Sequence, residues 1–234
     1  MLNGIEGVMD LAAASGEDLA GVSDIVTDAM TAFGLSADGT TKIIKDGFTK
    51  EVSNASHFAD VLAAASANSN TNVAMLGESF KYAAPVAGSL GYSVEDTAIA
   101  LGLMASSGLK SSMAGSSLRT ILTNLAKPTD DISDAMDYLG ISLQNGDGSM
   151  KSLMEIVTDL RGAFGQCKMP MDQFQENLAK LDEKYANGEL TEKKYNEALA
   201  DLTEKAYGAE GALKAKYAAT LAGKEGMSGL LSIV

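Results

Sequence analysis

The sequence predicts an all-α protein of about ten helices, with one small β-hairpin and one helical hairpin inserted into the bundle. Hydrophobic residues make up 46% of the 234 residues, which is enough for a substantial core. Aromatic residues make up only 6% and Trp is absent, so the core consists of Ala, Leu, Ile, Val and Met, which suits close helix packing. Apolar residues also recur at helical spacing through most of the chain.

Residues 93–127 are expected to form the centre of the bundle. Ser93 followed by Asp96 is typical of a helix N-terminus. The run 98–105 is apolar on every face, which predicts a helix buried on all sides. A turn at 106–110 leads to a second helix, which ends at Lys127 before a proline.

Helical spacing predicts further helices before and after this pair. They cover residues 5–14, 17–33, 56–66, 73–90, 130–139 and 150–164. Residues 40–54 differ, because short β-branched runs flank Asp46-Gly47, a pair that favours a tight hairpin turn. We expect a two-stranded hairpin that projects from the helical body and is marginal by itself.

Beyond residue 164 the composition changes. Two Lys- and Glu-rich runs in 168–207 flank Asn187-Gly188 and repeat apolar residues in steps of four, three and four. This pattern predicts an antiparallel helical hairpin with a narrow apolar seam and a solvated back. We therefore expect a helical core at 1–164, a charged helical hairpin at 168–207, and a tail at 208–234 that returns to the core.

The charge balance restricts the partners of the chain. The net charge is -13, and no Lys or Arg precedes Lys42. Such a surface repels nucleic-acid backbones and anionic lipid, so direct nucleic-acid binding is not expected. A single cysteine, Cys167, excludes a disulfide within the chain. No apolar run approaches transmembrane length.

Few residues point to catalysis or metal binding. His57 and Cys167 are the only residues of their kinds, and a nucleophilic pair or zinc site needs more partners. Residues 107–110 match Ser-x-x-Lys, but the other motifs of penicillin-recognising enzymes are missing. Residues 145–149 resemble the start of a calcium loop but lack its later glycine and glutamate. We expect no catalytic, cofactor-binding or metal-binding residues.

Paired carboxylates of a cell-wall glycosidase are the strongest enzymatic alternative. Glu78 and the pair Glu95-Asp96 are the candidates near the apolar centre. Each is better explained as a helix-surface or capping residue, since carboxylates are favourable in the first turn of a helix.

Five stretches in fixed order carry a family resemblance: FADVLAAAS at 58–66, LGESFKYAAPVA at 76–87, GYSVEDTA at 91–98, GLMASSGLK at 102–110 and AGSSLR at 114–119. Together they resemble the core region of bacteriophage tail tape measure proteins. Residues 24–36 resemble the family's preceding helix and 218–231 resemble the end of that region, whereas 40–54 and 168–207 look like insertions.

The resemblance implies a virion protein that acts in tail assembly, tail length determination and genome ejection. It implies the tail tube protein, tail assembly chaperones and other tail-tip proteins as partners. It also implies residence in the tail tube lumen, in the host cytoplasm during assembly, and membrane contact only during ejection. From the residues themselves we expect no enzymatic activity, and self-association of the chain is a separate expectation. A helical tape for a tail of about 1,000 Å needs roughly 670 residues, so this chain is expected to be a module or a shortened relative of such a ruler.

Two alternatives remain. One is a lytic or membrane-active accessory of the phage tail. The other is a helical scaffold that binds a partner through residues 168–207, because a narrow apolar seam can also accept another helix.

Overall fold

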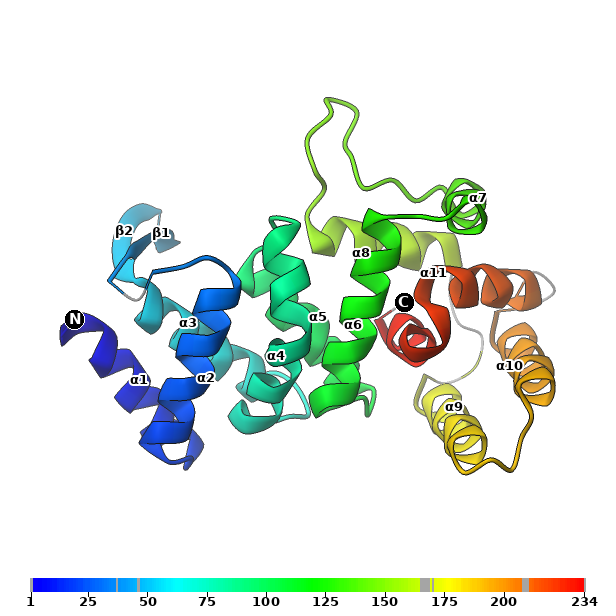
Figure 1. Cartoon of the computed structure of the whole chain (residues 1–234), viewed down its shortest axis with the longest axis horizontal. Coiled ribbons are helices and arrows are strands. Elements are labelled where there is room, and N and C mark those ends of the chain that lie inside the picture. The colour runs from blue at the N-terminus through cyan, green and yellow to red at the C-terminus, as the bar shows by residue number, and fades with distance from the viewer. Residues whose placement is uncertain are drawn as a thin grey trace. The chain divides into compact units, whose positions relative to one another are not determined.

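The computed structural model describes residues 2–36, 38–45, 47–164, 169, 171–207 and 211–233, and it confirms the predicted all-α class (Figure 1). Within these ranges, eleven helices accompany one two-stranded antiparallel sheet. The elements are α1 (Leu2–Ser15), α2 (Leu19–Ala32), β1 (Thr40–Lys45), β2 (Phe48–Ser53), α3 (Asn54–Ala67), α4 (Val73–Ser89), α5 (Val94–Ser106), α6 (Ser111–Ala126), α7 (Asp130–Leu139), α8 (Leu153–Phe164), α9 (Met171–Ala186), α10 (Glu192–Tyr207) and α11 (Gly211–Ile233).

The chain divides into two compact units. The first comprises Met1–Ser106 and Lys110–Arg119, and the second comprises Ser107–Leu109 and Thr120–Val234. The three-part division expected at 1–164, 168–207 and 208–234 stays a prediction.

In the first unit, α1 packs on α3, α2 packs on α4, and both α3 and α4 pack on α5. Phe80 lies at the centre, with edge-to-face rings of Phe58 at 5.4 Å and Phe33 at 6.2 Å. Glycine brings α4 close to α2, since a Cβ at Gly88 would lie 2.6 Å from the carbonyl oxygen of Ala32. The Ala- and Gly-rich composition therefore allows helices to pack through their backbones.

The start of α6 is fixed on α4 by a similar close approach. A Cβ at Gly115 would lie only 2.2 Å from the carbonyl oxygen of Ser79. The Ser79 hydroxyl is buried, and the carbonyls of Ser111 (2.7 Å) and Met75 (3.0 Å) share its single donor in a bifurcated hydrogen bond. Ser111 has a positive φ of 57°, and the hydrogen bond from Ser79 holds its carbonyl in that unusual conformation.

Helix α5 departs from the prediction in one respect. Ala100, Leu101 and Met104 are fully buried, but Ile99 is 45% exposed and Leu103 is half-buried. The expectation of burial on every side is therefore wrong for the Ile99 face. The reason is geometric, because α3 and α4 cover the other faces of α5 and leave this stripe open.

In the second unit, α7, α8, α9 and α10 all contact α11. Helix α11 is broken at Gly223, which has a non-helical backbone (φ 66°, ψ -178°). The amide of Asn124 donates a hydrogen bond to the carbonyl of Leu221 at 2.8 Å, just before this break. The predicted helical hairpin is confirmed as α9 and α10, which pack together and are joined through Gly188 at positive φ.

Candidate interaction surfaces

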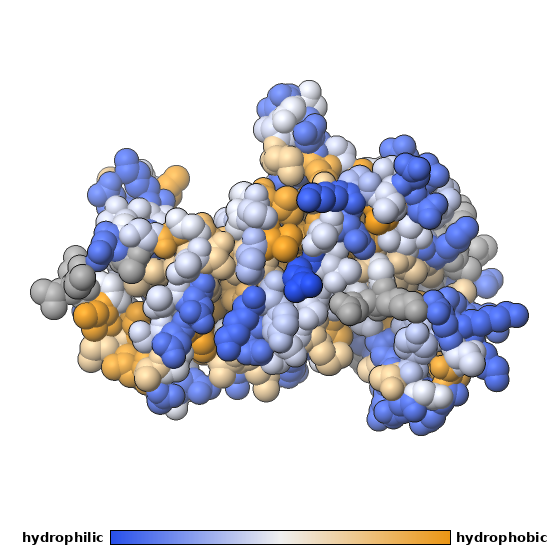
Figure 2. All heavy atoms as spheres, viewed as in Figure 1, coloured by the Kyte–Doolittle hydropathy of each residue, from blue (hydrophilic) through white to orange (hydrophobic). Residues whose placement is uncertain are grey.

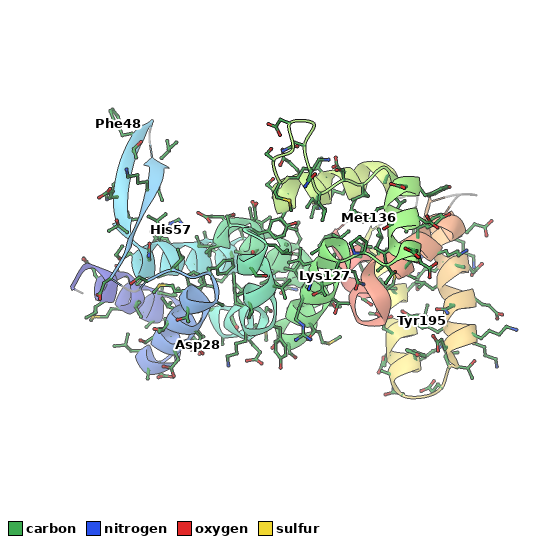
Figure 3. All side chains as sticks on the ribbon, turned by 45° about the horizontal axis from the view of Figure 1, so that its top comes forward. Asp28, Phe48, His57, Lys127, Met136 and Tyr195 are labelled. Carbon is green, nitrogen blue, oxygen red and sulfur yellow. The ribbon has the colours of Figure 1, made fainter. Side chains whose placement is uncertain are left out.

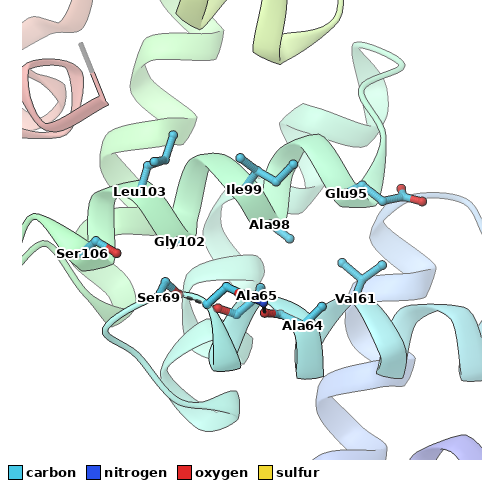
Figure 4. Close-up of a pocket in the computed structure, with 11 residues that line it drawn as sticks. Val61, Ala64, Ala65, Ser69, Glu95, Ala98, Ile99, Gly102, Leu103 and Ser106 are labelled. Atoms are coloured by element: carbon cyan, nitrogen blue, oxygen red, sulfur yellow. Dashed lines mark hydrogen bonds between the residues drawn. The ribbon is translucent and has the colours of Figure 1, made fainter.

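An open apolar groove runs between α3 and α5 in the first unit (Figure 4). Its volume is about 340 Å³. Each helix contributes residues at a spacing of three and four, so that one stripe of each helix faces the groove. The lining residues are Val61, Ala64, Ala65, Asn68 and Ser69 from α3 and its end, and Glu95, Ala98, Ile99, Gly102, Leu103 and Ser106 from α5.

Small side chains on both helices create the space for this groove. Alanine occupies positions 64, 65 and 98, whereas Ile99 and Leu103 provide the larger apolar surfaces. At the C-terminal end of α5 the walls approach closely, since a Cβ at Gly102 would lie 3.3 Å from the Ser69 hydroxyl oxygen. The groove is suited to apolar side chains rather than to a polar substrate.

One hydrogen-bonded pair lies at the end of the groove where α5 begins. His57 Nε2 and Glu95 Oε1 are 2.8 Å apart, and their side chains are 12% and 47% exposed, respectively. Glu95 lies in the first turn of α5, where a carboxylate is favourable. The structure thus pairs His57 with Glu95, whereas Cys167 lies outside the described residues.

The β-hairpin forms a second surface, which we call the hairpin arm (residues 40–53). Its strands pair from Thr40 opposite Ser53 to Lys45 opposite Phe48, so the predicted hairpin at 40–54 is confirmed. Phe48 and Ile44 are 77% and 81% exposed. Figure 3 places Phe48 at the free end of the arm, and Figure 2 shows the arm as largely hydrophilic with apolar atoms at its edge.

Asn54 fixes the base of the hairpin arm. It is 4% exposed, and its side-chain amide donates to the carbonyl of Ser36 (2.8 Å) while its side-chain oxygen accepts from the Thr41 hydroxyl (2.6 Å). Its backbone N–H donates to the carbonyl of Gly39 at 3.0 Å. Because both ends of the arm meet at this residue, the arm has a defined direction where it leaves α3.

The helical hairpin α9–α10 forms a third surface. Phe174, Leu178 and Leu199 belong to the predicted apolar seam, and all three side chains are buried. The part of this hairpin that is visible in Figure 2 is mostly hydrophilic. Tyr185 and Tyr195 stack at 4.7 Å, and the Tyr195 hydroxyl donates to Asp182 at 2.6 Å. Two effects raise the pKa of Tyr195: burial, which is the larger, and the hydrogen bond to Asp182.

The residues considered for catalysis are engaged in structural contacts. Glu78 pairs with Lys81 at 3.0 Å on the surface of α4, and the hydrogen bond to Glu78 raises the pKa of Lys81. The Ser107 hydroxyl donates to the carbonyl of Ser232 (3.0 Å) and accepts from the side chain of Gln175 (2.9 Å). The Ser107 hydroxyl thus links residues of α9 and α11, whereas the Glu78–Lys81 pair lies within α4.

The loop resembling a calcium site is a turn. Asp147 accepts hydrogen bonds from the backbone and hydroxyl of Ser149, which lowers the pKa of Asp147. Across the described ranges no group of three or more His, Cys, Asp or Glu residues is arranged to hold a metal ion. In the same part of the chain, no helix combines the length and apolarity needed to cross a membrane.

Sequence reasoning identified Glu95 and the β-hairpin but missed the groove. The sequence did contain a signal, because Ile99 and Leu103 form an i, i+4 pair on a helix that is apolar on every face. The neighbouring helices α3 and α4 leave the Ile99 face of this helix exposed. An apolar stripe of this kind indicates either complete burial or an open surface, and the sequence does not distinguish the two.

Comparison with known proteins assigns the family. Residues 1–223 match the family described as phage-related minor tail protein, and the chain belongs to that family. The tape measure protein of Pneumococcus phage Dp-1 is 39% identical over 163 residues, which cover 70% of this chain and 13% of that protein. The probable tape measure protein of Escherichia phage P2 is 27% identical over 135 residues, covering 58% of this chain and 17% of that protein.

The resemblance to tape measure proteins at residues 58–122 is therefore confirmed. The chain spans less than a fifth of the length of either relative. No solved structure matches it.

Proposed function

We propose that this chain is a non-enzymatic structural module of a phage or prophage tail tape measure protein, acting in tail assembly and tail length determination and in genome ejection. The observation that carries the proposal is the 39% identity to the tape measure protein of phage Dp-1. The family match over residues 1–223 supports it, because it covers the first compact unit and most of the second.

The proposed partners are the tail tube protein, tail assembly chaperones and tail-tip proteins. The proposed location is the lumen of the tail tube, with the host cytoplasm as the site of assembly. The surface chemistry supports a binding role, since the apolar groove and the exposed hairpin arm offer contacts to other proteins.

An in-frame deletion in the producing phage or prophage tests the tail role. Removing the segment for residues 1–223 is expected to abolish complete tails in electron micrographs. Normal tails from that deletion mutant would refute the proposal. A separate deletion of residues 168–207 tests the scaffold alternative, which predicts loss of one partner while tails of normal length still form.

A lytic role is tested by biochemistry. The carboxylates of Glu78 and Glu95 are held by Lys81 and His57, which supports a structural reading of both. We expect the purified chain to release no fragments from peptidoglycan. Turnover that disappears in Glu78→Gln or Glu95→Gln would show that the chain is an enzyme.

A further inference from the structure

We propose that the hairpin arm of one copy of this chain inserts Phe48 into the α3–α5 groove of a second copy, with Lys50 facing Glu95. Both surfaces lie in the first unit, so every copy would carry one arm and one groove. The proposal concerns the isolated chain and is independent of the tail role.

The arm has the properties of an anchor. Phe48 is 77% exposed at the tip, and large rigid aromatic side chains are enriched at protein interfaces. Within the strand register Ile43 pairs with Lys50 and Lys45 pairs with Phe48. Phe48 and Lys50 are two residues apart on one strand and therefore share a face of the ribbon, whereas Ile44 lies on the other face.

The arm cannot use the groove of its own chain. Asn54 fixes the base of the arm at the start of α3, and a six-residue strand extends about 20 Å from there. Figure 3 shows the tip standing clear of the helices, while the groove begins at Val61, farther along α3. Insertion therefore requires a second copy.

The groove is complementary to this anchor in shape, polarity and charge. It is concave and apolar, and its volume of about 340 Å³ lies at the lower end of the range for ligand pockets, which suits one or two side chains. Its acidic residue is Glu95, at one end of the lining. The arm carries Lys42, Lys45 and Lys50 against Asp46 and Glu51, so its three positive and two negative charges leave it slightly cationic in a chain whose net charge is -13. Lys42 pairs with Glu51 at 4.0 Å on the other face, whereas Lys50 lies on the same face as Phe48.

The contact is heterologous, since different surfaces of the two copies meet. Repeated heterologous contacts produce either a closed ring or an open chain of subunits. The interface is small, so we expect weak association that rises with protein concentration and falls with salt.

Sedimentation velocity of the purified chain tests the proposal between about 1 and 500 μM. Phe48→Ser and Ile99→Lys are each expected to weaken association at least tenfold, roughly the effect of losing one interface anchor. Ile44→Ser is the matched control, because it removes an equally exposed apolar side chain from the opposite face of the same arm. All three positions are exposed, and unchanged circular dichroism confirms that each variant is folded.

Mixing the two disabled variants gives the decisive result. Phe48→Ser retains the groove and Ile99→Lys retains the arm, so an equimolar mixture is expected to form a one-to-one complex that grows no further. The proposal would be overturned by a wild-type chain that stays monomeric throughout, by equal loss in Ile44→Ser and Phe48→Ser, or by a mixture that forms no complex. Association that survives both substitutions would also overturn it and assign the interface to other residues.

Discussion

Replacing Gly115 with alanine tests the close approach of α6 to α4. The new Cβ would lie 2.2 Å from the carbonyl oxygen of Ser79, whereas ordinary contact begins near 3.4 Å. The helices must therefore separate locally by about 1.2 Å, which also strains the hydrogen bond from Ser79 to Ser111.

The expected cost follows from two opposing terms. Overpacking of this kind costs about 1–3 kcal/mol, and we take the upper end because the obstructing atoms belong to the backbone. Alanine regains about 1 kcal/mol of helix propensity over glycine. Gly115→Ala should therefore lower the free energy of unfolding by about 2 kcal/mol, measured from urea denaturation followed by circular dichroism.

Gly162→Ala is the matched control. Gly162 lies in α8, and a Cβ there would meet no atom within 4 Å. The same substitution should therefore stabilise the protein by about 0.5–1 kcal/mol. The free energy of unfolding of each variant is compared with that of the wild type at the unfolding transition of the unit that holds the substitution, which is the first unit for Gly115 and the second for Gly162. A Gly115→Ala protein as stable as the wild type would refute the inference that backbone contact joins α4 and α6.

Three further predictions concern individual hydrogen bonds. Asn54→Ala removes the contacts to Ser36 and Thr41, so the backbone amides of the hairpin arm should exchange with deuterium faster, while those of α5 remain protected. Asn72→Ala removes the acceptor for the N–H of Met75 at the start of α4 and should cost about 1 kcal/mol in urea denaturation, whereas Asn72→Asp should retain most of that stability. Because the pKa of Tyr195 is raised on folding, its contribution to stability is complete below about pH 10 and is lost as the pH rises further. Tyr195→Phe should reduce this alkaline loss in thermal melts, and an unchanged pH profile would contradict the assignment.

Local sequence patterns were sufficient to predict the positions of most helices and strands. The helix predicted at 130–139 coincides with α7, and the hairpin predicted at 40–54 contains β1 and β2. Helical spacing and the turn chemistry of Asp-Gly act over a few residues, so the chain alone carries this information. The family resemblance likewise rested on motifs in sequence order, and the match over residues 1–223 confirms it.

The candidate surfaces were less predictable, because they depend on which helix faces remain uncovered. Ile99 and Ala100 are adjacent in an apolar run, yet one is 45% exposed and the other is fully buried. His57 and Glu95 are 38 positions apart, and only the packing of α3 on α5 brings them to 2.8 Å.

The sequence by itself determined the helical class, most helix positions, the two hairpins and the relation to tail proteins. These features depend on residue type and on spacing along the chain. Only the tertiary structure decided that α5 has an open face, that Asn54 directs the arm away from the helices, and that Gly115 brings two backbones into contact. The physical reason is that burial and close approach are properties of pairs of elements, and helical periodicity specifies an apolar face without specifying what covers it.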